Sequence, residues 1–170
     1  VWVDNEDPAL ADTAVSTSLV ASGGIVAERA MWWPGPTPAT WAESHTEVGA
    51  TTTATTWAVA DAMAGRDATT STFLLIANPT STAGRARVTL YGTLGDVAAT
   101  REYDLPATSR TTAWLVQDFP QISSGLFSAI VESLAGDTTP AVPITVERAS
   151  YSRDFAAGSA VSATALTPPN

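Results

Sequence analysis

Short runs of apolar and β-branched residues, broken by Gly, Pro, Asn or Asp, recur along the whole chain. Few windows place apolar residues at the helical spacing i, i+3, i+4 and i+7, and helix-favouring residues are scarce. Val, Ile, Thr and aromatic residues between turn-forming residues are typical of strands. The pattern predicts about ten strands and little helix. The predicted strands are residues 14–21, 24–33, 53–59, 72–77, 86–93, 98–105, 110–116, 125–133, 143–152 and 159–165.

Turn-forming residues predict how these strands connect. Ser22-Gly23-Gly24 predicts an N-terminal hairpin, and Leu94-Gly95-Asp96 predicts a second one. The apolar run at residues 73–76 predicts a central strand that stops at the turn signal Asn78-Pro79. Residues 61–70 fit one helical turn or a plain loop. Many short strands at regular spacing indicate a sandwich or barrel, and we predict an all-β, Ig-like antiparallel β-sandwich.

Composition fits one folded domain, or one domain and a fragment, of 170 residues. Charged residues make up 15% of the chain, and its six Trp, four Phe and three Tyr argue against disorder. The net charge is −9, and all eight basic residues are Arg. An acidic chain without a basic stripe repels phosphate backbones, so we exclude nucleic-acid binding. Arg without Lys, with abundant Ala and Thr, fits a high-GC bacterial genome.

Several site types and locations are disfavoured by what the sequence lacks. Cys is absent, which excludes thiol catalysis, cysteine–zinc sites and iron–sulfur clusters. No apolar run approaches the roughly 20 residues of a membrane span, so we expect no membrane-spanning segment. The chain starts without Met or a signal-peptide pattern, which indicates a processed or excised segment. The acidic, Thr-rich composition favours an extracellular, cell-surface location.

A Glu-Arg-Ala motif occurs twice, 119 residues apart. Residues 25–32 read Ile-Val-Ala-Glu-Arg-Ala-Met-Trp, and residues 144–151 read Ile-Thr-Val-Glu-Arg-Ala-Ser-Tyr. The match continues downstream, where Glu47-Val48-Gly49-Ala50-Thr51 parallels residues 160–164 at an offset of 113. A longer Pro-rich loop in the first copy accounts for the six-residue difference. Upstream, residues 14–20 resemble residues 127–133.

The repeat predicts the domain organisation. Residues 1–33 form an N-terminal hairpin that is a partial copy of the repeat end, and residues 34–47 form a Pro/Trp-rich connection. Residues 48–152 form the main sandwich repeat. Residues 153–170 start the next repeat or form a C-terminal strand.

These motifs resemble a tandem repeat of about 110–120 residues in secreted and cell-surface proteins of actinobacteria and related high-GC bacteria. The matching stretches are residues 48–57 (VGATTTATTW), 73–79 (FLLIANP), 86–91 (ARVTLY), 105–112 (LPATSRTT), 130–133 (IVES) and 144–151 (ITVERASY). The departures are Ser150 in the second motif copy and extra length at residues 137–141. The resemblance implies a β-sandwich repeat without known catalysis that builds extended surface structures. It brings no catalytic residues.

The charged pairs of the motif, Glu28-Arg29 and Glu147-Arg148, lie on predicted strands, so the members of each pair point to opposite faces. We expect a structural role, in which Arg or Glu bridges to a neighbouring strand or pairs with an acid such as Glu132. A binding role is the alternative.

Candidate reactive groups are few. His45, the one histidine, forms with Glu43 and Glu47 an alternating set that could face a metal, but one His without Cys makes a poor site. A hydrolase would need His45, yet no Gly-x-Ser-x-Gly elbow is present. No spacing selects a glycosidase pair among Asp61, Asp67, Asp96, Asp104, Asp118 and Glu132. Residues 4–7 are acidic but lack calcium-loop spacing. We predict no enzyme, metal or cofactor.

Three tryptophans flank the Pro-rich loop: Trp32, Trp33 and Trp41. Exposed aromatic side chains can stack on sugars, whereas Trp57 and Trp114 lie in predicted strands and are expected in the core. We predict a structural or adhesive repeat whose partners are adjacent copies of itself, with filament assembly by strand pairing. The alternative is a carbohydrate-binding module that holds polysaccharide on the loop tryptophans.

Overall fold

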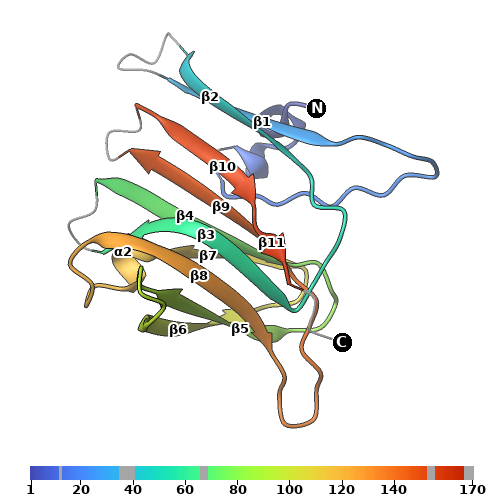
Figure 1. Cartoon of the computed structure of the whole chain (residues 1–170). Coiled ribbons are helices and arrows are strands. Elements are labelled where there is room, and N and C mark those ends of the chain that lie inside the picture. Colours follow the sequence, from blue (N-terminus) through green and yellow to red (C-terminus); the bar gives the residue numbers. More distant parts are fainter. Residues whose placement is uncertain (12, 35–40, 66–68, 153–155, 167–170) are drawn as a thin grey trace.

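The computed structural model describes residues 1–11, 13–34, 41–65, 69–152 and 156–166. These residues form eleven strands, all in antiparallel pairs, with three helical segments of three or four residues (Figure 1). The all-β prediction is confirmed. The strands are β1 (Glu28–Pro34), β2 (Trp41–Val48), β3 (Thr56–Ala64), β4 (Thr70–Asn78), β5 (Gly84–Tyr91), β6 (Val97–Leu105), β7 (Ser109–Trp114), β8 (Gly125–Leu134), β9 (Thr145–Ser152), β10 (Gly158–Ser162) and β11 (Thr164–Ala165). The helical segments are α1 (Val3–Glu6), η1 (Pro8–Leu10) and α2 (Leu115–Asp118).

Two sheets pack face to face as a sandwich. One has the order β10-β9-β4-β7, and the other has the order β11-β3-β8-β5-β6. Because side chains alternate along a strand, every second residue points between the sheets. In β4 the inward set is Thr72, Leu74, Ile76 and Asn78, all buried. The apolar core joins Leu74 and Ile76 to residues of both sheets, so the predicted central strand is confirmed.

The end of β4 is fixed by a buried amide. The Asn78 side chain donates to the carbonyl oxygens of Thr82 at 2.8 Å and Pro106 at 3.0 Å, and its oxygen accepts from the Thr80 amide at 3.0 Å. A buried amide whose polar atoms are all bonded stabilises the turn. The sequence signal Asn78-Pro79 therefore marks a real chain reversal.

The predicted hairpins have opposite outcomes. β5 and β6 pair around residues 92–96, as predicted. The N-terminal hairpin is wrong: the described residues 14–27 contain no strand, and β1 pairs with β2. The predicted Pro/Trp-rich connection at 34–47 therefore contains a strand, while residues 35–40 lie outside the described part. His45 and Glu47 lie on this strand, and their side-chain partners Tyr151 and Ser162 are more than 100 residues away in the sequence.

Two shorter predictions also change. Residues 61–64 and 70 are strand, because β3 continues to Ala64 and β4 begins at Thr70; residues 66–68 are not described. The predicted strand at 159–165 is divided between sheets. β10 pairs with β9, and after one residue β11 pairs with β3. The chain thus crosses from one sheet to the other along one side of the sandwich.

Both motif copies lie on the first strand of an antiparallel hairpin. β1 pairs Glu28 with Val48, and β9 pairs Glu147 with Ser162. Outside the ladders, Gly49 donates to the Ala27 carbonyl at 3.0 Å, and Ala163 donates to the Val146 carbonyl at 2.9 Å. By strand pairing, Val48 therefore corresponds to Ser162, whereas the sequence match aligned Val48 with Val161. A shift of one residue moves each side chain to the other face of the strand, so the equivalent residues of the two hairpins are assigned from strand pairing.

Candidate functional site

The hairpin formed by β1 and β2 lies on the outer face of the four-stranded sheet, over β9 and β10 (Figure 1). Val146 points into the core, so alternation along β9 places Glu147 on the outer face. On β1 and β2, the side chains of Arg29, His45 and Glu47 share the face that meets this sheet. We call this contact the hairpin interface. It brings the two copies of the motif together.

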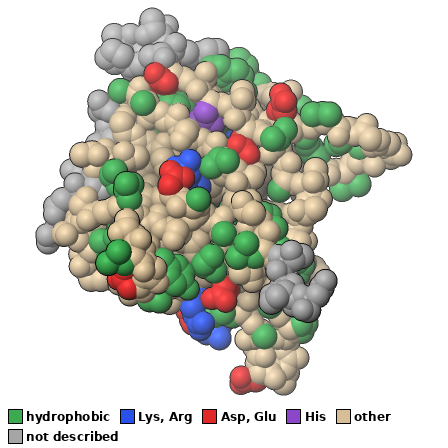
Figure 2. All heavy atoms as spheres, in the orientation of Figure 1, with side chains coloured by type: hydrophobic (Ala, Val, Ile, Leu, Met, Phe, Trp, Pro, Cys, Tyr) green, Lys and Arg blue, Asp and Glu red, His purple; other side chains and the backbone are tan. Residues whose placement is uncertain are grey.

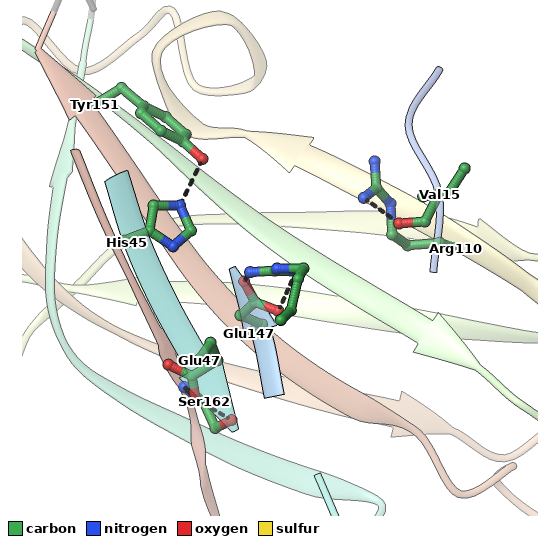
Figure 3. Close-up of polar contacts among 8 residues, drawn as sticks. Val15, His45, Glu47, Arg110, Glu147, Tyr151 and Ser162 are labelled. Carbon is green, nitrogen blue, oxygen red and sulfur yellow. Dashed lines mark hydrogen bonds and ion pairs between the residues drawn. The ribbon is translucent and has the colours of Figure 1, made fainter. Parts of the chain in front are cut away.

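An ion pair joins the two motif copies. The Arg29 guanidinium binds both carboxylate oxygens of Glu147, with Nη1 donating to Oε2 at 3.0 Å and Nη2 donating to Oε1 (Figure 3). A two-pronged Arg–carboxylate contact fixes orientation as well as distance. The side chains are 39% and 20% exposed, so solvent screens the pair only in part.

A histidine–tyrosine contact lies beside the ion pair. His45 Nε2 is 3.2 Å from the Tyr151 hydroxyl, and the Trp33 ring meets the Tyr151 ring edge-on at 5.5 Å between centroids. Burial, helped by the positive charge of Arg29, lowers the pKa of His45, although Glu147 and Glu47 oppose the shift. Burial also raises the pKa of Tyr151. His45 is therefore neutral at pH 7 and serves as a packed hydrogen-bonding group.

The third contact covers a sheet edge. β10 is the outermost strand of its sheet, and Glu47 accepts hydrogen bonds from the Ser162 amide at 2.9 Å and from its hydroxyl at 2.7 Å. An uncovered edge strand invites pairing with another chain. Here a side chain of the hairpin occupies part of that edge (Figure 3).

An aromatic row continues from the hairpin across the sheet. Tyr151 meets Phe73 at 6.1 Å between centroids, and Phe73 stacks on Trp114 at 5.5 Å. Trp114 is exposed, so its predicted core position is wrong, whereas the prediction for Trp57 is confirmed.

Beside the row, Arg110 donates to the Val15 carbonyl at 3.0 Å and so holds the N-terminal segment against the sheet. Burial lowers the pKa of Arg110.

The second motif copy places its arginine on the other side of the strand. Arg148 points between the sheets and pairs with Asp61 of β3 at 3.2 Å. The opposite-face prediction for Glu147 and Arg148 agrees with these contacts. The suggested partner Glu132 is wrong for Arg148, because Glu132 lies between the buried residues Val131 and Ser133 and faces outward from the five-stranded sheet. Glu28 is exposed on the outer face of the hairpin.

The three loop tryptophans do not form one platform in the described structure. Trp32 and Trp33 are neighbours on β1 and point to opposite faces, with Trp32 exposed and Trp33 packed on Tyr151 and His45. Trp41 begins β2, but its side chain lies outside the described part of the chain. Trp33 therefore contributes to the hairpin interface.

The candidate reactive groups are dispersed. His45 contacts Tyr151 while Glu47 contacts Ser162, and among the described residues no group of three or more His, Cys, Asp or Glu could hold a metal ion. Asp7 accepts from the Ala9 amide at 2.8 Å and caps η1. Asp118 binds the Tyr103 hydroxyl at 2.9 Å and the Trp114 amide at 3.0 Å, which anchors α2. Asp67 lies outside the described residues. Asp7 and Asp118 thus have local structural contacts.

The comparisons add no relative: no protein family, curated protein or solved structure matches this chain. Among the described residues, no helix is long and apolar enough to cross a membrane.

Sequence reasoning missed four residues of this region: Tyr151, Ser162, Arg110 and Gly158. Tyr151 belongs to the second motif copy, and its alternation with Glu147 along one strand could have indicated a shared face. Nothing local marks Ser162 or Arg110, because each binds a segment more than 90 residues away. Gly158 lies against nearby Tyr151 and also against Trp33, which is more than 100 residues away.

Proposed function

We propose that this chain is a non-catalytic structural repeat module of a bacterial cell surface, in which successive repeats contact each other through their Glu-Arg-Ala hairpins. The observation that carries the proposal is the ion pair between Arg29 of the first copy and Glu147 of the second. A motif that binds its own repeat supplies a contact that tandem copies can use along an array.

The chemistry of the interface supports a mechanical role. Arg29, His45 and Glu47 each bind the neighbouring hairpin through at least one charged or polar side-chain atom. A general base must itself lie within hydrogen-bond reach of the substrate proton that it removes. These groups face each other, and the pairing stabilises one fixed relation between two hairpins. The acidic, Cys-free composition supports the extracellular location.

The test uses the bacterium that encodes the protein, with an epitope tag on the full-length chain. We expect the tag to be removed by protease added to intact cells and to be recovered from the envelope in large assemblies. Glu147→Ala should reduce the assembled fraction several-fold, while Glu28→Ala, at the equivalent exposed position, should leave it unchanged. A tag that is protected inside intact cells, or assemblies insensitive to Glu147→Ala, would refute the proposal.

Carbohydrate binding remains the second candidate, and one observation favours it. Phe73 and Trp114 stack on the outer face of the sheet, with Trp114 exposed to solvent, and such aromatic surfaces bind sugar rings. Titration of tryptophan fluorescence with soluble polysaccharides tests it. A change that disappears in Trp114→Ala and persists in Trp32→Ala would assign binding to this pair. No change with any polysaccharide would exclude it for those tested.

A further inference from the structure

The chain between η1 and β1 forms an apolar arm that projects from the molecule. The arm consists of residues 16–26, which are all exposed to solvent. Figure 1 shows this segment running out from the sandwich and back to β1, and Figure 2 shows hydrophobic side chains along it. It carries four large aliphatic side chains with exposed fractions from 56% to 96%: Leu19, Val20, Ile25 and Val26. Exposed apolar side chains that gather on one surface mark a contact site for a partner.

Both ends of the arm are held by the body of the molecule. Arg110 donates to the Val15 carbonyl at 3.0 Å, and Gly49 donates to the Ala27 carbonyl at 3.0 Å. Between these two anchors, residues 16–26 make no hydrogen bond within the described part of the chain. A Cβ added to either glycine at the tip would meet no atom within 4 Å. The arm is therefore presented outward, and its own molecule leaves it uncovered.

A second apolar surface lies on the outer face of the five-stranded sheet. Strand pairing places Leu126 beside Met63, and Tyr91 beside Val97. Leu126 is 61% exposed and Val97 is 59% exposed. Buried residues of β3, β5 and β8 alternate with this set, so its side chains point outward. We call the set the apolar face, and it consists of Met63, Tyr91, Val97, Leu126 and Ile130.

The distribution of charge permits these two surfaces to meet. The chain has a net charge of −9, which opposes association between two copies. Residues 13–27 include no charged residue, and the apolar face includes none either. At the other end of the same sheet face, Arg85 and Arg87 bind Glu102 at 3.1 and 2.9 Å, so those charges are paired with each other. An arm seated on the apolar face thus brings no acid against another acid.

The arm and the apolar face of one molecule lie on opposite sides of the sandwich. The arm leads into β1, whose hairpin covers the outer face of the four-stranded sheet, whereas the apolar face belongs to the other sheet (Figure 1). Both sheets separate the two surfaces, so they can meet only between two molecules. Such a contact leaves one arm and one apolar face unused, and it can therefore continue from copy to copy.

We propose that the arm of one molecule packs on the apolar face of a second copy of this chain, and that this contact repeats head to tail. A second copy is the partner because each surface supplies the apolar cover that the other lacks. Pairing of two arms would leave the apolar face uncovered. The contact joins separate molecules and leaves Arg29 bound to Glu147, so it goes beyond the proposed function and does not depend on it.

The test follows the mass of the purified 170-residue chain against its concentration by analytical ultracentrifugation. We expect the average mass to rise past that of a dimer, because a head-to-tail contact does not close. Val20→Asp on the arm and Leu126→Asp on the apolar face should each raise the dissociation constant by about a hundredfold, because each buries an unpaired carboxylate among apolar groups. Val1→Asp adds the same charge at an exposed apolar residue outside both surfaces and should leave association unchanged.

A mixture of the two variants separates this contact from other modes of association. Val20→Asp retains the apolar face and Leu126→Asp retains the arm, so an equimolar mixture should form a one-to-one dimer and grow no further. Both side chains are mostly exposed, so circular dichroism should show an unchanged fold.

Three results would overturn the proposal. The first is a wild-type chain that stays monomeric up to millimolar concentration, and the second is a mixture of the variants that stays monomeric. The third is association that Val20→Asp abolishes and Leu126→Asp retains, which would indicate pairing between arms. Each of these results leaves the proposed function standing, because the ion pair between Arg29 and Glu147 lies within one molecule.

Discussion

β1 and β9 carry the same Glu-Arg-Ala motif in different surroundings. β9 lies between β10 and β4 and contributes Val146 to the core, whereas β2 is the one strand paired with β1 among the described residues, and the hairpin lies on the outside of the sandwich. Equivalent residues consequently differ: Arg148 points between the sheets, while Arg29 binds Glu147 at the surface.

The difference teaches that the motif specifies a strand and its two faces, while the neighbouring strands decide what each face does. A two-stranded hairpin outside a larger sheet is only marginally stable by itself in water. Variants at equivalent positions of the two copies should therefore separate the free energy of unfolding of the sandwich from the docking of the hairpin.

The largest contrast is expected between Ile144→Ala and Ile25→Ala. Ile144 is fully buried, so truncation leaves a cavity and should lower the free energy of unfolding by about 2–5 kcal/mol. Ile25 is mostly exposed, and its truncation should change that free energy by no more than about 0.5 kcal/mol. Urea unfolding followed by circular dichroism measures both. Equal losses would contradict the assignment of Ile25 to the outside of the core.

A smaller effect is expected at Gly158, which takes the place of Ser44 in the first hairpin. A Cβ at Gly158 would come within 2.5 Å of the Tyr151 ring and 2.9 Å of the Trp33 ring. Gly158→Ala should therefore push the hairpin away and cost about 1–3 kcal/mol of its docking free energy. Amide exchange at residues 28–33 reports docking, with Ser44→Ala as the matched control. Exchange as slow as in the wild type would show that the rings tolerate the methyl group.

Next comes the ion pair. Glu147→Ala should weaken docking by about 1 kcal/mol, a value kept low because Arg29 is more than a third exposed. Glu28→Ala, at the equivalent position on β1, should have no effect. A double-mutant cycle with Arg29→Ala, read by amide exchange at residues 28–33, isolates the pair. Additive single effects would mean that the two side chains contribute independently.

The smallest expected effect is a pH dependence of docking. Burial and Arg29 lower the pKa of His45 in the docked hairpin below its ordinary value of 6.5. The released hairpin therefore binds the proton more tightly, so docking is most favourable above pH 6.5 and weakens as the pH falls through that value. The weakening ends once docked His45 is itself protonated. Amide exchange at residues 28–33 between pH 7.5 and 5, corrected for intrinsic rates, should show this trend, and His45→Gln should abolish it.

The interior of the sandwich was predictable because its signals are local. Strand alternation around Leu74 and the turn signals at Asn78-Pro79 and Leu94-Gly95-Asp96 lie within a few residues of the structures they predict. The N-terminal hairpin failed for the opposite reason: Ser22-Gly23-Gly24 looks like a turn, but the described residues 14–21 form no strand for it to connect. The Ig-like identity of the sandwich stays a prediction.

The site was predictable only in its charged residues. The duplication singled out Arg29 and Glu147, and the sequence could not show that they bind each other. Trp114 was expected inside because it lies in a strand, but alternation from buried Ala113 places it on the outer face. Assigning a residue to a strand leaves its face open until one neighbour is known to be buried.

The sequence by itself determined an all-β chain, a repeated Glu-Arg-Ala strand and opposite faces for the paired charges, because alternation and turn chemistry act over a few residues. Tertiary structure alone decided that β2 is the partner of β1, that Val48 takes the place of Ser162, and that Arg29 meets Glu147. Strand partners and register depend on which surfaces become buried together, and those surfaces come from segments about a hundred residues apart.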